Sequence, residues 1–332
     1  MNWFQKKIIF LDYASATPVL TEVREVMDKY WSRDFYNPSA IYEEGVRVKK
    51  EVDEFKSKVA ELMGAAKEGV LFTSGGTESN VLAVLGLKNT HVIIDTESHP
   101  SVSEAAKGLN VSTWRLGQEL EIGKTTTLIS TVTTDNKIGR KVRQWRRLDE
   151  TKRPLLHVDA SQTANYFKIG LEALACDLIT LDGAKLYGPK GIGALVVRKG
   201  VVLDLPPRGT LPVPLIGGFV KALEIASRDR ESEAKRLTVL SQKFAEMLRH
   251  SLPSIGVSVT VPNIVNVSVP AMLPEFLVLS LERHGVLSSA GPACNSNKPE
   301  PPETPVRFSF GRFSTLSDVR RAAETFYRVC RL

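Results

Sequence analysis

Short apolar segments alternate with helix-like segments between residues 70 and 181. The apolar segments are rich in β-branched residues and end in polar or glycine-containing turns, a pattern typical of strands. They lie at residues 70–73, 91–95, 126–133, 155–159 and 178–181. Strands that alternate with helices pair in parallel, so this stretch predicts an α/β domain with a mostly parallel sheet between helices.

The second half of the chain is organised differently. Residues 215–251 are helix-like and rich in charge, and strand-like segments and a terminal helix-like segment at 316–332 follow them. This order predicts a smaller α+β domain. A chain of 332 residues is long enough for two domains. We expect a large domain over residues 16–217, and a small domain formed by residues 1–15 and 218–332.

Residues suited to chemistry follow the expected strands at their carboxyl ends. In parallel α/β sheets, ligands bind at this edge, so side chains from several strand ends should meet there. Each signal is weak alone, but together they predict one ligand site. Its expected members are Gly76, Thr77, His99, Asn136, Asp159, Gln162 and Lys185.

Residues 179–197 read ITLDGAKLYGPKGIGALVV and place Lys185 between a strand end and a tight Gly/Pro loop. A lysine that closes a strand and faces a pocket is a candidate for Schiff-base chemistry, because burial lowers the pKa of an amine and exposes a nucleophile. Taken alone, the stretch is also compatible with a solvated loop lysine.

Residues 74–80 read SGGTESN and connect an expected strand to an expected helix. Free N–H groups and the helix dipole at such a point favour an anion, and Thr77 can add a hydroxyl. The glycine spacing matches neither the dinucleotide fingerprint nor the P-loop. A capped helix without a ligand is the alternative interpretation.

Composition excludes several classes of protein. The formal net charge is +7, but the basic residues are scattered, so direct nucleic-acid binding is not expected. No apolar run reaches the roughly 18 residues of a membrane span, and we expect a cytoplasmic protein without a membrane segment. The cysteines, Cys176, Cys294 and Cys330, lack the spacing of a disulfide framework or a metal site. Cys294 differs from the others because it lies in a loop of small polar residues.

Taken together, these motifs resemble the cysteine desulfurases, the pyridoxal-phosphate (PLP) enzymes of the class V aminotransferase group. The resemblance runs nearly end to end and rests on FLDYASATPV, FTSGGTESN, HVDASQ, KLYGPKGIGAL, RGTLPVPLIGG, VPNIVNVSV, GPAC and VRFSFGRFST. It implies fold type I of the PLP-dependent transferases, PLP as cofactor and a homodimer.

The resemblance also implies roles for individual residues. Lys185 would form the Schiff base with PLP and move protons at the substrate Cα. Asp159 would pair with the pyridine N–H, and His99 would stack on the ring. The other implied ligands are Gly76, Thr77 and, from the partner subunit, Thr210 for the phosphate; Gln162 for the phenolic oxygen; and Asn136, Arg307 and Asn37 for the substrate.

The implied reaction converts L-cysteine to L-alanine and leaves a persulfide on Cys294, which a sulfur-acceptor protein receives for iron–sulfur clusters or tRNA thiolation. Three alternatives stay open: a selenocysteine lyase, an aminotransferase of the same fold, and a degenerate, non-catalytic relative. An aminotransferase needs no thiol on this loop, so Cys294→Ala separates it from a desulfurase.

The sequence departs from the family pattern near the lysine. Relatives carry a Ser-x-His-Lys pattern whose serine and histidine help to bind phosphate, whereas this chain has Asp182 and Ala184. An aspartate facing a dianionic phosphate costs energy unless it is paired or turned away, so we expect weaker cofactor affinity or a rearranged phosphate cup. The segment before Thr210 is also short, and a proline-rich link separates Cys294 from Arg307.

Overall fold

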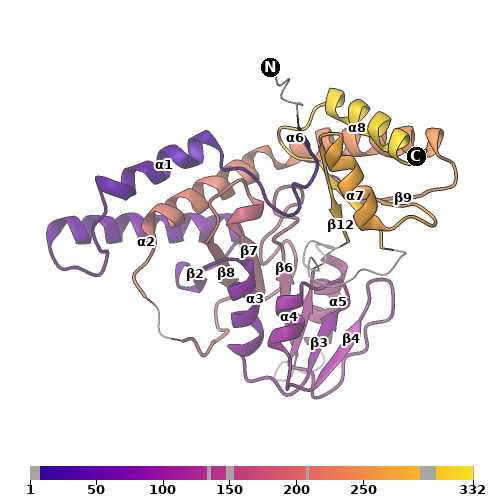
Figure 1. Ribbon diagram of the computed structural model, residues 1–332. Coiled ribbons are helices and arrows are strands. Elements are labelled where there is room, and N and C mark those ends of the chain that lie inside the picture. The colour runs from indigo at the N-terminus through magenta and orange to yellow at the C-terminus, as the bar shows by residue number, and fades with distance from the viewer. Residues whose placement is uncertain (1–7, 133–135, 147–152, 207–208, 292–303, 332) are drawn as a thin grey trace. The chain divides into compact units, whose positions relative to one another are not determined.

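The computed structural model describes residues 8–132, 136–146, 153–206, 209–291 and 304–331. The chain divides into two compact units (Figure 1). The larger unit is Pro18–Arg230, and the smaller unit combines Met1–Thr17 with Glu231–Leu332. In the described part of the chain, no helix has the length and apolar character needed to cross a membrane.

A seven-stranded sheet forms the centre of the larger unit. Its strand order is β2-β8-β7-β6-β5-β3-β4. The bounds are β2 Val70–Thr73, β3 Val92–Asp95, β4 Val111–Trp114, β5 Leu128–Thr131, β6 Leu155–Asp159, β7 Leu178–Asp182 and β8 Gly193–Val197. All neighbouring pairs are parallel except the two that involve β8. The prediction of a mostly parallel α/β sheet is therefore confirmed.

Strand β8 is antiparallel because the connection from Asp182 to Gly193 is short. A parallel crossover needs about a dozen or more residues, usually with a helix, and this connection instead forms a tight loop. Its first part is the 3₁₀ helix η2, Gly183–Lys185. The chain therefore returns immediately beside β7, and this pairing fixes the backbone on both sides of Lys185.

Helices cover both faces of this sheet, and alternating strand residues explain how. In β3, Ile93 belongs to one apolar cluster, whereas Val92 and Ile94 belong to another on the opposite face. The first cluster includes residues of α1, α2, α5 and the start of α6, and the opposite face packs against α3 and α4 (Figure 1). The bounds are α1 Thr21–Ser32, α2 Glu43–Met63, α3 Gly76–Leu85, α4 Pro100–Ala105, α5 Asn136–Arg146 and α6 Val213–Ser251, with a 3₁₀ turn η1 at Lys67–Gly69.

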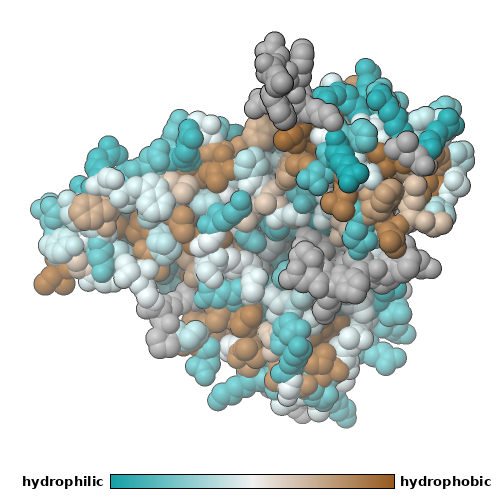
Figure 2. Space-filling model, viewed as in Figure 1, coloured by the Kyte–Doolittle hydropathy of each residue, from teal (hydrophilic) through white to brown (hydrophobic). Residues whose placement is uncertain are grey.

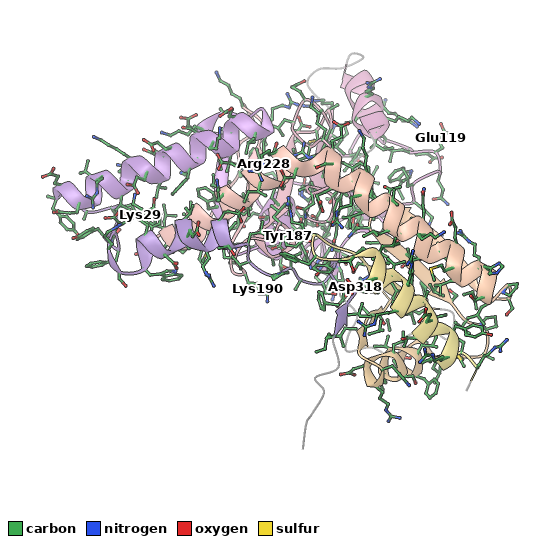
Figure 3. The ribbon with its side chains drawn as sticks, turned by 90° about the horizontal axis from the view of Figure 1, so that it is seen from above. Lys29, Glu119, Tyr187, Lys190, Arg228 and Asp318 are labelled. Atoms are coloured by element: carbon green, nitrogen blue, oxygen red, sulfur yellow. The ribbon has the colours of Figure 1, made fainter. Side chains whose placement is uncertain are left out.

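Helices α1 and α2 form a long pair in which apolar and ionic contacts combine. Apolar residues Val48, Val52 and Val59 recur on the buried face of α2. Lys29 of α1, labelled in Figure 3, donates a 2.6 Å hydrogen bond to Glu51 of α2. Helix α2 ends at Gly64, whose left-handed φ of 65° suits glycine.

The smaller unit is built around a four-stranded antiparallel sheet in the order β12-β13-β10-β9. A two-stranded parallel sheet of β1 and β11, two helices and the end of α6 complete it, as the α+β pattern of the second half predicts. The bounds are β1 Ile9–Phe10, β9 Gly256–Val261, β10 Ile264–Ser268, α7 Pro274–Arg283, β11 Val286–Leu287, β12 Ser289–Ala290, β13 Val306–Ser309 and α8 Leu316–Val329. Its core is aromatic, with Phe308 contacting Phe244 and Phe326.

Candidate active site

The larger unit brings several of the expected residues to one edge of its sheet. Asp159 ends β6, Lys185 lies in η2 directly after β7, and His99 follows β3 as the N-cap of α4. The strands β3, β6 and β7 share one direction, so their carboxyl ends lie at the same edge. The charges of Asp159, Lys185 and Asp182 all affect the pKa of His99, which places the four groups in one electrostatic environment.

The carboxylate of Asp159 is held by two N–H donors. Its Oδ1 accepts a 3.0 Å hydrogen bond from the backbone of Ser161, and its Oδ2 accepts a 2.8 Å bond from Asn80 Nδ2. Asn80 is buried in α3 and also donates to Ser101 Oγ. The orientation of this carboxylate is therefore fixed by groups on either side of it.

Asn80 and Ser101 were not among the residues expected from sequence. Both support predicted residues: Asn80 holds Asp159, and Ser101 contacts His99. The available signal was a polar asparagine at the start of the apolar segment 81–87, on a helix side that turns out to be buried. A buried amide needs partners, so such a residue marks a polar network.

His99 is half-buried and neutral at neutral pH. Its Nδ1 accepts a 3.0 Å hydrogen bond from the backbone N–H of Ser101, so the ring caps α4. Pro100 occupies the first turn of this helix, where its missing N–H costs nothing. Burial lowers the pKa of His99, and Lys185 lowers it further, against the opposing effect of Asp159.

Lys185 is half-buried, and its backbone is clamped. Its carbonyl accepts a 2.6 Å hydrogen bond from Asn165 Nδ2, and the Gly183 N–H donates to the Ile192 carbonyl at 2.9 Å. A Cβ at Gly183 would lie 2.7 Å from the Pro189 carbonyl oxygen, so only glycine fits. Tyr187, which is labelled in Figure 3, continues the loop, and its φ of 59° lies in the left-handed region. The tight packing of this loop therefore fixes the position of the Lys185 backbone.

The backbone at the N-terminus of α3, where the sequence suggests an anion site, forms a cradle with Ser161 and Asp182. A Cβ at Gly76 would lie 3.1 Å from Ser161 Oγ and 3.3 Å from Asp182 Cβ, so glycine permits a close approach of the backbone. Ser161 Oγ is buried and has no hydrogen-bond partner among the described residues. Thr77, the second predicted phosphate ligand, is exposed beside this cradle.

Asp182 occupies part of the cradle. Its Oδ1 accepts a 2.9 Å hydrogen bond from the Ala184 N–H, and the carboxylate also accepts one from the Gly76 N–H. Burial raises the pKa of Asp182, and Asp159 raises it further, whereas Ala184, Lys185 and Gly76 act in the opposite direction. The carboxylate is therefore paired with backbone donors rather than turned away.

Three other predicted residues of the larger unit lie in different settings. Gln162 and Thr210 are exposed, and Thr210 helps to line a cavity of about 330 Å³ together with Ser74 and Glu78. Asn37 is also exposed, and its Oδ1 accepts a 2.9 Å hydrogen bond from the Ser39 N–H in a local turn. Their proposed roles stay predictions.

Two predicted residues lie partly or wholly outside the described part of the chain. Asn136 is the first residue of α5, and its side chain is not described. Cys294 lies outside the described residues. Among the residues that are described, no group of three or more His, Cys, Asp and Glu side chains is arranged to hold a metal ion.

Arg307 is a buried cation in the smaller unit. It is 7% exposed, and its Nη2 donates to Asp12 Oδ1 at 2.9 Å and to Ser15 Oγ at 2.8 Å. Its Nε has no hydrogen-bond partner in the described part of the chain. An unpaired N–H on a buried guanidinium is available to a carboxylate ligand. Sequence reasoning did not single out Asp12 and Ser15, although both lie in the motif FLDYASATPV.

Fold and site together describe an α/β protein in which Lys185, Asp159 and His99 lie at the carboxyl edge of the sheet. The family model for class-V aminotransferases matches residues 9–209 and 207–322. A cysteine desulfurase IscS 1 from Archaeoglobus fulgidus is 31% identical over 95% of this chain and 95% of the relative. A cysteine desulfurase IscS from Methanosarcina thermophila is 31% identical over 96% and 91%.

Solved structures show the same fold. A NifS-like protein from Rickettsia africae superimposes with a TM-score of 0.85 over 98% of this chain and 100% of that one, at 18% identity. Another NifS-like protein gives a TM-score of 0.84 over 97% and 99%, at 22% identity. The chain belongs to the class-V aminotransferase family, within its group of PLP-dependent cysteine desulfurases.

Proposed function

We propose that this protein is a PLP-dependent cysteine desulfurase, which converts L-cysteine to L-alanine and carries the released sulfur as a persulfide on Cys294. The observation that carries the proposal is the convergence of Lys185, Asp159 and His99 at one edge of the sheet. The relatives that are named cysteine desulfurases match nearly the whole chain, which supports the same activity.

The residues present at the edge fit PLP. The fixed carboxylate of Asp159 retains lone pairs that can accept the pyridine N–H. Ser161 Oγ, which has no partner among the described residues, can donate to a phosphate at the N-terminus of α3. The half-buried Lys185 supplies the amine. When bound, PLP supplies an electron sink that stabilises negative charge at the substrate Cα beside the Cβ–S bond.

We assign the remaining work to the chain's own groups. The amine of Lys185 holds the cofactor and moves a proton at the substrate Cα, and Asp159 keeps the ring nitrogen protonated. The imidazole of His99, whose pKa burial lowers, would lie against the ring of the bound cofactor. In the same proposal, Gln162 donates to the phenolic oxygen, and Thr77 and the partner subunit's Thr210 bind the phosphate.

Arg307 is proposed to hold the substrate carboxylate, with Asn136 and Asn37 beside it. Its unpaired Nε, next to an Nη2 already fixed by Asp12, leaves donor capacity for a carboxylate. Burial strengthens such an ion pair because little water screens it. Arginine suits this role because its planar fork can bind two carboxylate oxygens at once.

Cys294 is proposed to be the nucleophile. Cys176 is fully buried and therefore inaccessible to a substrate, and burial raises the pKa of Cys330 to about 11, so Cys330 is not a ready thiolate at neutral pH. The Cys294 thiolate attacks the substrate sulfur, and the Cβ–S bond breaks with its electron pair moving to Cβ. A proton then reaches Cβ to give alanine, and the sulfur stays on Cys294 as a persulfide.

The wider setting is also proposed. We infer that a sulfur-acceptor protein takes the persulfide sulfur for iron–sulfur cluster assembly or tRNA thiolation, in the cytoplasm, and that the smaller unit carries the Cys294 loop. A homodimer is supported by apolar side chains exposed near the end of the α1–α2 pair (Figure 2), since a second copy can cover them. They include Trp31, Phe35 and Ile41.

The test is incubation of the purified protein with PLP and L-cysteine, with alanine and sulfide measured for wild type, Lys185→Ala and Cys294→Ala. We expect alanine from the wild type, and none above background from either variant. An aminotransferase would retain its activity in Cys294→Ala. A protein that shows no new absorbance band after PLP is added would be a non-catalytic relative.

A further inference from the structure

The cradle at the N-terminus of α3 contains a group of the wrong charge for a phosphate. The Gly76 N–H, which belongs to the first turn of this ten-residue helix, already donates to the carboxylate of Asp182. A dianionic phosphate beside an ionised Asp182 would be repelled, and it would compete for the same donor. When a phosphate binds, either Asp182 or the phosphate must therefore change its charge or its position.

A second, independent observation marks the cradle as a ligand site. Ser161 Oγ is at least nine-tenths buried, lies 3.1 Å from the Cβ position of Gly76, and has no partner among the described residues. A buried hydroxyl without a partner is costly, because it has lost its water without gaining a hydrogen bond. An oxygen of a bound phosphate would satisfy it.

The groups that face Asp182 explain why it can become neutral. Asp159 at the end of β6 repels its charge, and burial opposes ionisation. Lys185 in η2 and the N–H groups of Ala184 and Gly76 favour the ionised form. His99 at the start of α4 also interacts with Asp182, but burial keeps this ring neutral at neutral pH. The balance raises the pKa of Asp182, so a further negative charge nearby would promote its protonation.

We propose that the cradle is a proton-linked phosphate site, in which Asp182 takes up one proton when the phosphate of PLP binds and then donates a hydrogen bond to it alongside Ser161 Oγ. The proton comes from the solvent and is released when the phosphate leaves. This inference rests on the proposed function, because it takes PLP as the ligand. It makes Asp182 a determinant of how cofactor affinity depends on pH.

The experiment measures binding to the apo-protein rather than activity. Dissociation constants for PLP and for pyridoxal, which lacks the phosphate, are determined from about pH 6 to about pH 9, above the ordinary aspartate pKa of about 3.9. Wild type is compared with Asp182→Asn, whose amide mimics the protonated acid, and with Asp182→Ser. The matched control is Asp204→Asn, an exposed aspartate of the same unit.

We expect the dissociation constant for PLP to rise with pH more steeply in wild type than in Asp182→Asn. Because binding takes up one proton, the difference between the two proteins should reach about tenfold per pH unit. Asp182→Ser should lose the same pH dependence, and Asp204→Asn should keep it. Pyridoxal should bind wild type and Asp182→Asn with parallel profiles. Ser161→Ala should weaken PLP binding several-fold and leave pyridoxal binding unchanged.

Parallel PLP profiles for wild type and both Asp182 variants would overturn the proposal. So would an equal difference with pyridoxal, because Asp182 would then act on the Lys185 amine rather than on the phosphate. If neither compound binds any of these proteins, the cofactor assignment is wrong and the proton-linked cradle is wrong with it. If the PLP profiles of wild type and the Asp182 variants are parallel but the protein still produces alanine, the proton-linked phosphate site is wrong and the proposed function stands.

Discussion

Asn80 and Asp159 lie 79 residues apart in the sequence and are joined by a 2.8 Å hydrogen bond from the amide Nδ2 to the carboxylate Oδ2. The amide comes from the first helix after β2, and the carboxylate comes from the end of β6. Helix α3 therefore does two jobs at this edge of the sheet. Its backbone forms the proposed anion cradle, and Asn80 in its second turn fixes the carboxylate that is proposed to face the pyridine nitrogen.

Asn80→Ala removes both donors that Asn80 Nδ2 supplies, to Asp159 and to Ser101 Oγ. Within the described part of the chain, Asp159 then keeps the Ser161 N–H as its remaining donor, so its orientation is less well fixed. We expect PLP affinity to fall roughly tenfold, in line with the loss of a charge-assisted hydrogen bond worth about 1.5 kcal/mol or more. Equilibrium binding of PLP to the apo-protein measures this. Asn89→Ala, which removes a bond to the Val84 carbonyl elsewhere in the unit, is the control and should bind normally.

Arg307→Lys keeps the positive charge but removes the Nε–H and the planar fork. If Arg307 holds the substrate carboxylate, KM for L-cysteine should rise by about tenfold or more while PLP binding stays unchanged, since a point charge replaces a bidentate donor. Arg312→Lys is the matched control from the same unit and should leave KM within about twofold. Equal KM values for wild type and Arg307→Lys would remove Arg307 from the substrate site.

The persulfide should form on one cysteine only. After L-cysteine and PLP are added, mass spectrometry of peptides should find one extra sulfur atom on Cys294 and none on Cys176 or Cys330. The reason is that Cys176 is buried and burial raises the pKa of Cys330 to about 11. Cys330→Ser should therefore keep full activity. Sulfur carried by Cys330 instead would show that the nucleophile has been assigned wrongly.

The sequence predicted those features of the fold and of the site that depend on local residue patterns and on strand order. The parallel sheet followed from the alternation of segments, and the strand-end rule placed His99, Asp159 and Lys185 at one edge. Strand β4 escaped prediction because three of its four side chains are exposed, which leaves no apolar run to detect. The antiparallel direction of β8 follows from the short loop that precedes it, and the pattern of apolar segments does not show this consequence.

The partners of the supporting residues could not be predicted, for a physical reason. Asn80, Ser101 and Asp12 act through hydrogen bonds to residues distant in sequence, and no local pattern encodes such a pairing. Asp182 was visible as a departure from the family pattern, but only the structure pairs it with the N–H groups of Gly76 and Ala184. The sign of its effect on phosphate binding depends on that pairing.

His157 gives a prediction about stability rather than catalysis. It is fully buried in β6, where its Nδ1 lies 2.8 Å from Ser130 Oγ and its Nε2 lies 2.9 Å from Thr180 Oγ1. Burial lowers its pKa to about 4, with Asp159 acting in the opposite direction. An unfolded histidine has a pKa of about 6.5, so the unfolded chain binds a proton that the folded chain excludes.

The stability that this buried ring supplies is fully present above about pH 6.5 and is lost as the pH falls toward 4. We expect the free energy of unfolding of wild type to fall over this range by about 2–3 kcal/mol more than that of His157→Gln, which cannot titrate. Urea unfolding followed by circular dichroism at several pH values measures the difference. The control is His250→Gln, a substitution at the exposed end of α6, which should retain the steep profile of wild type. If His157→Gln is as sensitive to acid as wild type, the acid lability comes from another group.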